Sequence, residues 1–109
     1  MLDPVRRTRG VRGALVVSRE DGLVVASDLS PGVNGPAVAA LSASLSRRAD
    51  GLAAATGRPV PVSFELGGTE GSLLMAPGPE GLLVVAITSP ETDREEVRRR
   101  LLLVAEEAG

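Results

Sequence analysis

The sequence contains no cysteine, histidine, lysine, tyrosine or tryptophan, and its single aromatic side chain is Phe64. These absences remove most general bases and nucleophiles, the lysine that forms Schiff bases, and the soft metal ligands. Enzyme chemistry would have to depend on carboxylates, hydroxyls and arginine alone. We therefore predict a non-enzymatic protein without a cofactor or a metal site.

The composition also excludes several classes of partner and location. A formal net charge of -2 and one aromatic residue leave neither the basic stripe nor the stacking platform of nucleic-acid-binding proteins. The longest uninterrupted apolar run, Leu82 to Ile87, is far shorter than the roughly 20 residues of a membrane-spanning helix. Because the chain has no cysteine and no signal-like segment, we expect a soluble domain in the cytoplasm.

A length of 109 residues predicts one domain, residues 1–109, with a core over 10–108 and a short helix or tail at 1–9. The stretch from Pro36 to Thr56 has the period of one long helix with two unlike faces. The face that we expect to be core carries Val38, Leu41, Leu45, Ala49 and Leu52. The opposite face carries Ala40, Ala43, Arg47, Gly51 and Ala54.

This second face carries mostly small side chains instead of charged ones. Two interpretations of it remain open. Ala and Gly let two helix backbones approach closely, which indicates a helix-on-helix contact. Alternatively, the chain fills exposed helix positions with Ala because Ala is the best helix former. Gly51 favours the contact, since Gly costs about 1 kcal/mol relative to Ala inside a helix.

Five apolar runs predict five strands, at residues 14–18, 23–27, 59–66, 72–76 and 82–88. An Asp21-Gly22 turn joins the first two into a hairpin whose consecutive apolar residues predict cover on both faces. Pro61 places the third strand at a sheet edge, and the last run belongs in mid-sheet. A final helix has Thr92 as its expected N-cap, and its core face carries Val97, Leu101, Val104 and Ala108. We predict an α/β fold of the α+β type, with one antiparallel five-stranded sheet, the long helix on one face and the N- and C-terminal helices on the other.

Three other patterns have ordinary structural explanations. The glycine-rich residues 67–71 lack the Lys and Ser/Thr of a phosphate loop and lie between two strands. The acidic residues within 91–96 lie at a helix N-terminus, where carboxylates complement the helix dipole, so we predict no metal there. The arginines at 47–48 and 98–100 lie within helices, which favours solvated helix faces over an arginine finger.

The hairpin sequence from Gly10 to Ser27, GVRGALVVSREDGLVVAS, followed by an Ala/Leu-rich helix, resembles the roadblock / dynein light chain family. The resemblance covers about residues 8 to 108 and implies a roadblock / profilin-like fold. It implies a homodimer formed by the long helices and neighbouring sheet edges, whose paired helices bind a Ras-like small GTPase or serve as an assembly scaffold. In bacterial gliding regulators of this type, GTPase activation is ascribed to remodelling of the GTPase rather than to an inserted arginine.

The helix face and the resemblance together predict a dimer and partner interface. The prolines at 59 and 61 limit strand pairing at the start of the sheet edge, because they have no N–H to donate. Its predicted residues are Ala40, Ala43, Ser44, Arg47, Gly51 and Ala54 on the helix, and Ser63 and Glu65 on the edge strand. The leading interpretation is a dimeric adaptor that regulates a Ras-like small GTPase. The alternatives are a small-molecule-sensing domain, which the scarcity of inward polar groups disfavours, and a purely structural scaffold subunit.

Overall fold

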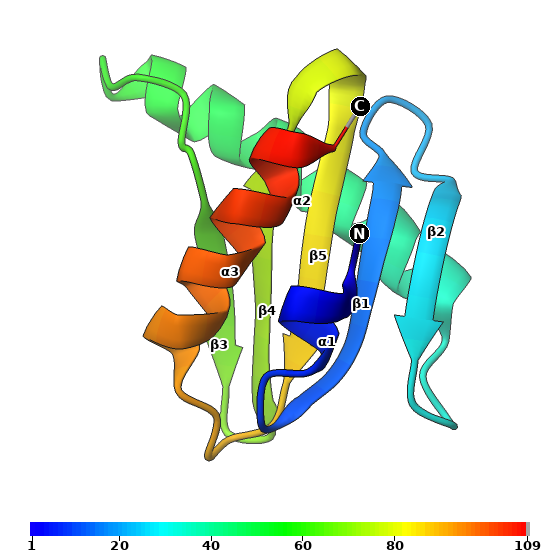
Figure 1. Ribbon diagram of the computed structural model, residues 1–109. Coiled ribbons are helices and arrows are strands. Elements are labelled where there is room, and N and C mark those ends of the chain that lie inside the picture. Colours follow the sequence, from blue (N-terminus) through cyan, green and yellow to red (C-terminus); the bar gives the residue numbers. More distant parts are fainter. Residues whose placement is uncertain (109) are drawn as a thin grey trace.

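The computed structural model describes residues 1–108 as a sheet with helices on both sides (Figure 1). In chain order the elements are α1 (Asp3–Arg6), β1 (Val11–Ser18), β2 (Val24–Leu29), α2 (Gly35–Ala55), β3 (Phe64–Gly68), β4 (Gly71–Pro77), the short 3-10 helix η1 (Pro79–Gly81), β5 (Leu82–Thr88) and α3 (Arg94–Glu107). Within residues 1–108, no helix is both long enough and apolar enough to cross a lipid bilayer.

The strands form one antiparallel sheet in the order β2-β1-β5-β4-β3. The central position of β5 confirms the prediction from the apolar run at 82–88, and the edge position of β3 confirms the prediction from Pro61. β3 begins at Phe64, later than the alternation from residue 60 predicts. The reason is that Pro59 and Pro61 have no N–H to donate to a strand ladder.

The sheet separates two apolar layers (Figure 1). α2 crosses one face, where it packs with Leu15, Met75 and Val85 of the strands. α1 and α3 cover the other face, where Val97 and Leu101 of α3 are fully buried. The predicted fold class is therefore confirmed, including the side of the sheet on which each helix lies.

Local capping signals set the ends of the two longer helices. The side chain of Asn34 accepts a hydrogen bond from the first turn of α2 at 3.1 Å, and Gly57 follows the last turn with a φ of +70°. The predicted N-cap of α3 is wrong by one residue, because Asp93 rather than Thr92 caps the first turn. The Thr92 hydroxyl is instead hydrogen-bonded to Ser89 Oγ at 3.0 Å.

The second strand of the hairpin is less buried than its sequence predicts. Leu23 and Val25 are 64% and 59% exposed, whereas Leu15 and Val17 of β1 are fully buried. β2 lies at the outer edge of the sheet, so it has a neighbouring strand on one side only. The prediction that both strands are covered on both faces is therefore wrong for β2, because consecutive apolar residues do not distinguish an edge strand from an inner one.

The turn of this hairpin lies against the middle of α2. A Cβ atom added to Gly22 would lie 3.1 Å from the Cα of Ala40 and 3.6 Å from the Cβ of Ala43. Gly22 also has a φ of +72°, a conformation that L side chains rarely adopt. The small side chains of Ala40 and Ala43 therefore leave space for the backbone of the hairpin.

We expect Gly22→Ala to destabilise the fold more than Gly57→Ala. The two glycines have φ values of +72° and +70°, so both substitutions meet a similar backbone cost of about 1 kcal/mol. An added Cβ at Gly57 would meet nothing within 4 Å, whereas one at Gly22 would press on α2. Overpacking should then add about 1 kcal/mol for Gly22→Ala. Urea unfolding of both variants measures the difference, and equal losses would contradict the close approach.

Candidate interaction surface

α2 packs on the sheet through small side chains. Its buried residues are all serine or smaller: Gly35, Ala39, Ser42, Ala43, Ser46 and Ala53. The predicted core face is therefore wrong, because Leu41 and Leu52 are 63% and 67% exposed. Val38, Leu45 and Ala49, from the same predicted face, are half-buried at its border. The helix is turned so that its smallest residues meet the sheet and its largest ones point away.

Leu41, Leu45 and Leu52 form a row along one side of α2, which we call the leucine flank. A hollow of about 560 Å³ lies beside the C-terminal end of the leucine flank, between α2 and the segment that leads into β3. Leu52, Pro61 and Phe64 are among its mostly apolar walls. The leucine flank is thus continuous with an open apolar hollow near the β3 edge of the sheet.

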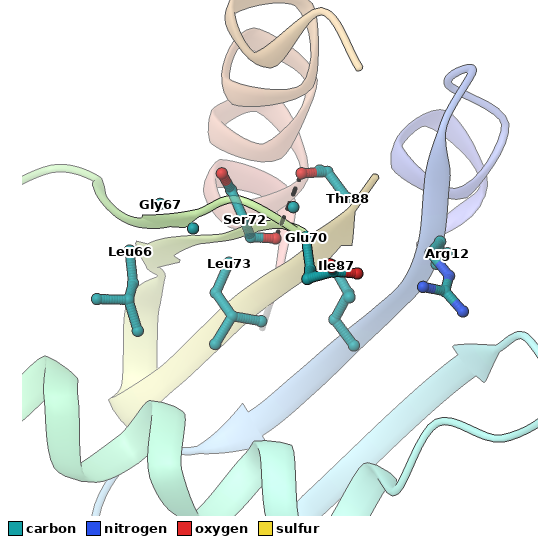
Figure 2. A pocket seen from close by; sticks show the side chains of 10 residues that line it. Arg12, Leu66, Gly67, Glu70, Ser72, Leu73, Ile87 and Thr88 are labelled. Carbon is teal, nitrogen blue, oxygen red and sulfur yellow. Dashed lines mark hydrogen bonds between the residues drawn. The ribbon is translucent and has the colours of Figure 1, made fainter. Parts of the chain in front are cut away.

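A second apolar row lies on the sheet itself. Leu66, Leu73 and Ile87 are neighbours across β3, β4 and β5, and we call this row the sheet shelf. Figure 2 shows the three side chains pointing to the side of the sheet that carries α2, with Arg12 of β1 beside them. The shelf forms the floor of a hollow of about 320 Å³, and Leu66 is exposed. α2 therefore leaves part of this sheet face uncovered.

The other side of α2 carries most of the residues predicted to contact a partner. Ala40, Arg47, Gly51 and Ala54 are exposed and Ser44 is half-buried. We call these five residues the small-residue flank. A Cβ atom added to Gly51 would meet nothing within 4 Å, so this part of the flank has open space above it.

Three other residues of the predicted interface lie elsewhere. Ala43 is buried beneath the hairpin turn, so the prediction that it lies on an exposed face is wrong. The side chains of Ser63 and Glu65 are held by α3: Arg98 Nε donates to Ser63 Oγ at 3.0 Å, and Arg94 Nε lies 2.9 Å from Glu65 Oε2. α3 thereby fastens the chain at the start of edge strand β3.

A charged cluster that the sequence does not predict fastens the hairpin to α2. Arg19 Nε donates to Ser46 Oγ at 2.6 Å, and the Arg19 guanidinium forms an ion pair with Asp50. Arg47 Nη1 donates to the backbone carbonyls of Arg19 and Glu20 at 2.9 and 3.4 Å. We call this set the Arg19 clasp. Its partners are 27 to 31 residues apart, so no local pattern could have revealed it.

The turn of the hairpin also contains a carboxyl group with a perturbed pKa. A hydrogen bond from the Ser18 side chain, together with one from the Leu23 N–H, holds the pKa of Asp21 below its usual value of 3.8. The carboxylate is exposed to solvent, so its effect is confined to the turn. The ionised form of Asp21 thus favours the turn that lies against α2.

The sequence and the fold agree with a known family. A family model described as the Roadblock/LC7 domain matches residues 1–88. The chain belongs to the Roadblock/LC7 domain family. Two uncharacterized proteins of Methanocaldococcus jannaschii are each 35% identical to this Roadblock/LC7 chain over 81 residues, which cover 74% of it and 70% of each relative.

Solved structures share the fold of this Roadblock/LC7 domain. Myxococcus xanthus MglB has a TM-score of 0.81 at 20% identity, over 97% of this chain and 83% of that one. A Roadblock/LC7 domain from Streptomyces avermitilis has a TM-score of 0.87 at 17% identity, over 98% and 89% of the two chains. The gliding protein MglB from Thermus thermophilus has a TM-score of 0.79 at 23% identity, over 98% and 87%. At these identities the similarity is one of fold.

We expect the Arg19 clasp to contribute measurable coupling to stability. The side chains of Arg19 and Asp50 are only 23% and 33% exposed, so water screens their interaction incompletely. A double-mutant cycle with Arg19→Ala and Asp50→Ala should give a coupling energy of about 1 kcal/mol. The matched control is Asp3 with Arg7, whose side chains are 69% and 80% exposed. Urea unfolding measures both cycles, and a coupling no larger than that of the control would show that the clasp is not stabilising.

The pKa of Asp21 predicts a pH effect with a definite sign. Because the folded-state pKa is lowered, the stabilisation is present above the unfolded pKa and is lost as the pH falls through the folded pKa, which lies below 3.8. NMR titration of the Asp21 carboxyl should give a lower pKa in the folded protein than in urea. The same pKa in both states would contradict the hydrogen bonds at this turn.

Proposed function

We propose that this Roadblock/LC7 domain forms a homodimer in which the leucine flanks of two α2 helices pack together. The exposure of Leu41 and Leu52 is the observation that carries this proposal. Leu41, Leu45, Arg48, Leu52 and Ala55 alternate spacings of four and three residues, which is the pattern of a helix-pairing seam. Burying an exposed leucine contributes about 1.5–3 kcal/mol, so two copies of this row would supply a substantial driving force.

The free edge of β3 supports the same arrangement. In a two-fold dimer each copy presents the same surface to the other, so two β3 edges can pair beside two α2 helices. The sheet shelf lies next to this edge and would receive apolar side chains of the second copy. Ser63 and Glu65 would then contribute through their backbone groups, because Arg98 and Arg94 of α3 hold their side chains.

The second part of the proposal concerns the partner. We infer that the dimer regulates a Ras-like small GTPase, which binds to the small-residue flanks of the paired α2 helices. The family resemblance motivates the class of partner, and the open space above Gly51 supports the position. Ala54 has a short exposed side chain that allows another backbone to approach closely.

The regulator itself would supply no catalytic residue. Arg47, the arginine within the small-residue flank, already donates to two carbonyls of the hairpin. An arginine engaged in this way is poorly placed to enter the nucleotide site of a GTPase. The proposed mode of action is therefore to hold or reshape the GTPase rather than to complete its active site.

The dimer proposal predicts that Leu41→Glu combined with Leu52→Glu yields a folded monomer. Both side chains are exposed in the single chain, so the substitutions remove no core contact. Light scattering should show half of the wild-type mass, while circular dichroism stays unchanged. The control is Leu103→Glu, which changes a leucine that is 55% exposed on α3 and should keep the dimer mass. A wild-type protein that is already monomeric at micromolar concentration would refute the dimer.

The partner proposal predicts that Gly51→Arg abolishes GTPase binding but keeps the dimer. The large side chain has room to project outward, so it should block the flank without disturbing the fold. The measurement is a pull-down with a Ras-like GTPase from the same genome, loaded with a GTP analogue or with GDP. Glu95→Arg, an equally bulky change on exposed α3, should bind like wild type. Equal capture by wild type and Gly51→Arg would place the partner elsewhere.

A further inference from the structure

A second apolar groove lies at the α3 side of the sheet. Its walls come from residues 60–62, from the β4-β5 connection at 77–79, and from Leu102, Ala105 and Glu106 in the last turns of α3. Its volume is about 720 Å³. In Figure 1 the β4-β5 connection and the last turns of α3 lie at the same end of the molecule. We call this hollow the α3 groove.

The floor of the α3 groove is apolar and open to solvent. Val60 and Val62 are 60% and 67% exposed, and Leu102 is half-buried beside them. Gly78 closes the groove against the helix, since a Cβ atom added there would lie 2.8 Å from the carbonyl oxygen of Ala105. The side chains of Val60 and Val62 are thus largely uncovered by the rest of the chain.

The charge at one end of the groove is negative. Glu106 lines it, and Glu107 follows in the same final turn of α3, which contains no basic residue. The C-terminal end of a helix already carries partial negative charge, so two glutamates there are unfavourably placed unless a cation lies nearby. Among the described residues that line the groove none is basic. Arg98 of α3 lies nearby, but its Nε donates to Ser63 Oγ, one residue after Val62.

The connection between β4 and β5 has an unusual backbone conformation next to the groove. Glu80, which follows the lining residue Pro79, has a φ of +59°, in the left-handed region that non-glycine residues rarely adopt. Non-glycine residues in this region cost about 1–3 kcal/mol and concentrate at functional positions. The turn thus keeps a glutamate where glycine or asparagine would be the less strained choice.

We propose that the α3 groove binds a short segment of a partner protein that carries apolar side chains next to Lys or Arg. The exposed valines and Leu102 would contact the apolar side chains, and Glu106 with the negative end of α3 would attract the cation. The groove shares Pro61 with the hollow beside the leucine flank, but α3 and the β4-β5 connection, which form its other walls, are not part of that hollow. α3 and α2 lie on opposite faces of the sheet. One domain could then bind this partner segment and, through α2, a second copy or a GTPase at the same time. Such a domain acts as an adaptor.

The proposal is tested by selecting random 12-residue peptides displayed on phage against the wild-type protein. Selected peptides are then measured by fluorescence anisotropy on two variants, Val60→Asn with Val62→Asn, and Glu106→Arg. The matched controls are Leu23→Asn with Val25→Asn, which changes side chains of similar exposure at the start of β2 and just before it, and Glu70→Arg on the β3-β4 turn. We expect peptides with apolar residues beside Lys or Arg, with affinity at least tenfold lower on both groove variants and unchanged on both controls.

Several results would overturn the proposal. One is that no peptide distinguishes the wild type from the Val60→Asn, Val62→Asn variant. Another is a selection of acidic peptides, or of peptides that bind equally to Glu106→Arg. A wild-type mass that falls when Val60 and Val62 are changed would identify a second copy of this chain as the occupant instead. The Leu41→Glu, Leu52→Glu variant should still bind the peptides, so failure here is distinct from failure of the dimer.

Discussion

The small side chains on one face of α2 set the distance between that helix and the rest of the molecule. Ala39, Ser42 and Ser46 lie against the sheet, and Ala40 and Ala43 leave space for Gly22 of the hairpin. A helix seated this closely has no room for leucine beneath it. Its leucines are therefore directed outward, and the exposed apolar surface of the domain follows from how deeply the helix sits.

Most of the fold could be predicted because its signals are local. The hairpin depends on an Asp-Gly turn, and α2 lies between its N-cap Asn34 and Gly57. Pro61 excludes an inner position in the sheet for the strand that follows it. The orientation of α2 could not be predicted in the same way, because periodicity shows that a helix has two faces without showing which one the sheet covers. Choosing the more apolar face as core fails for α2, because its small side chains rather than its leucines are buried.

The candidate surface was predictable only in part, because many of its contacts join residues that are far apart in the sequence. Gly51 and Ala54 stand out within the helix sequence and are exposed. The burial of Ala43 depends on a hairpin about 20 residues earlier in the chain, and the Arg19 clasp joins residues that are 27 to 31 apart. The sheet shelf arises from the register of β3, β4 and β5, which no single segment encodes.

The absence of lysine is consistent with how distant elements are joined, because each guanidinium has five donors in a planar fork and can satisfy several acceptors at once. Arg6, for example, donates to Asp28, Ser30 and the carbonyl of Val11.

α3 and α2 differ in how many of their large apolar side chains they bury. α3 buries Val97, Leu101 and Val104 in its own core, as a helix that serves stability does. α3 leaves Leu103 55% exposed, but α2 leaves both Leu41 and Leu52 exposed, at 63% and 67%, and fully buries none of its leucines. The fold tolerates this because Leu15, Val17, Leu83 and Val85 of the inner strands supply the apolar area of that layer. An apolar row that the fold does not need for its core is best explained by a contact outside the single chain.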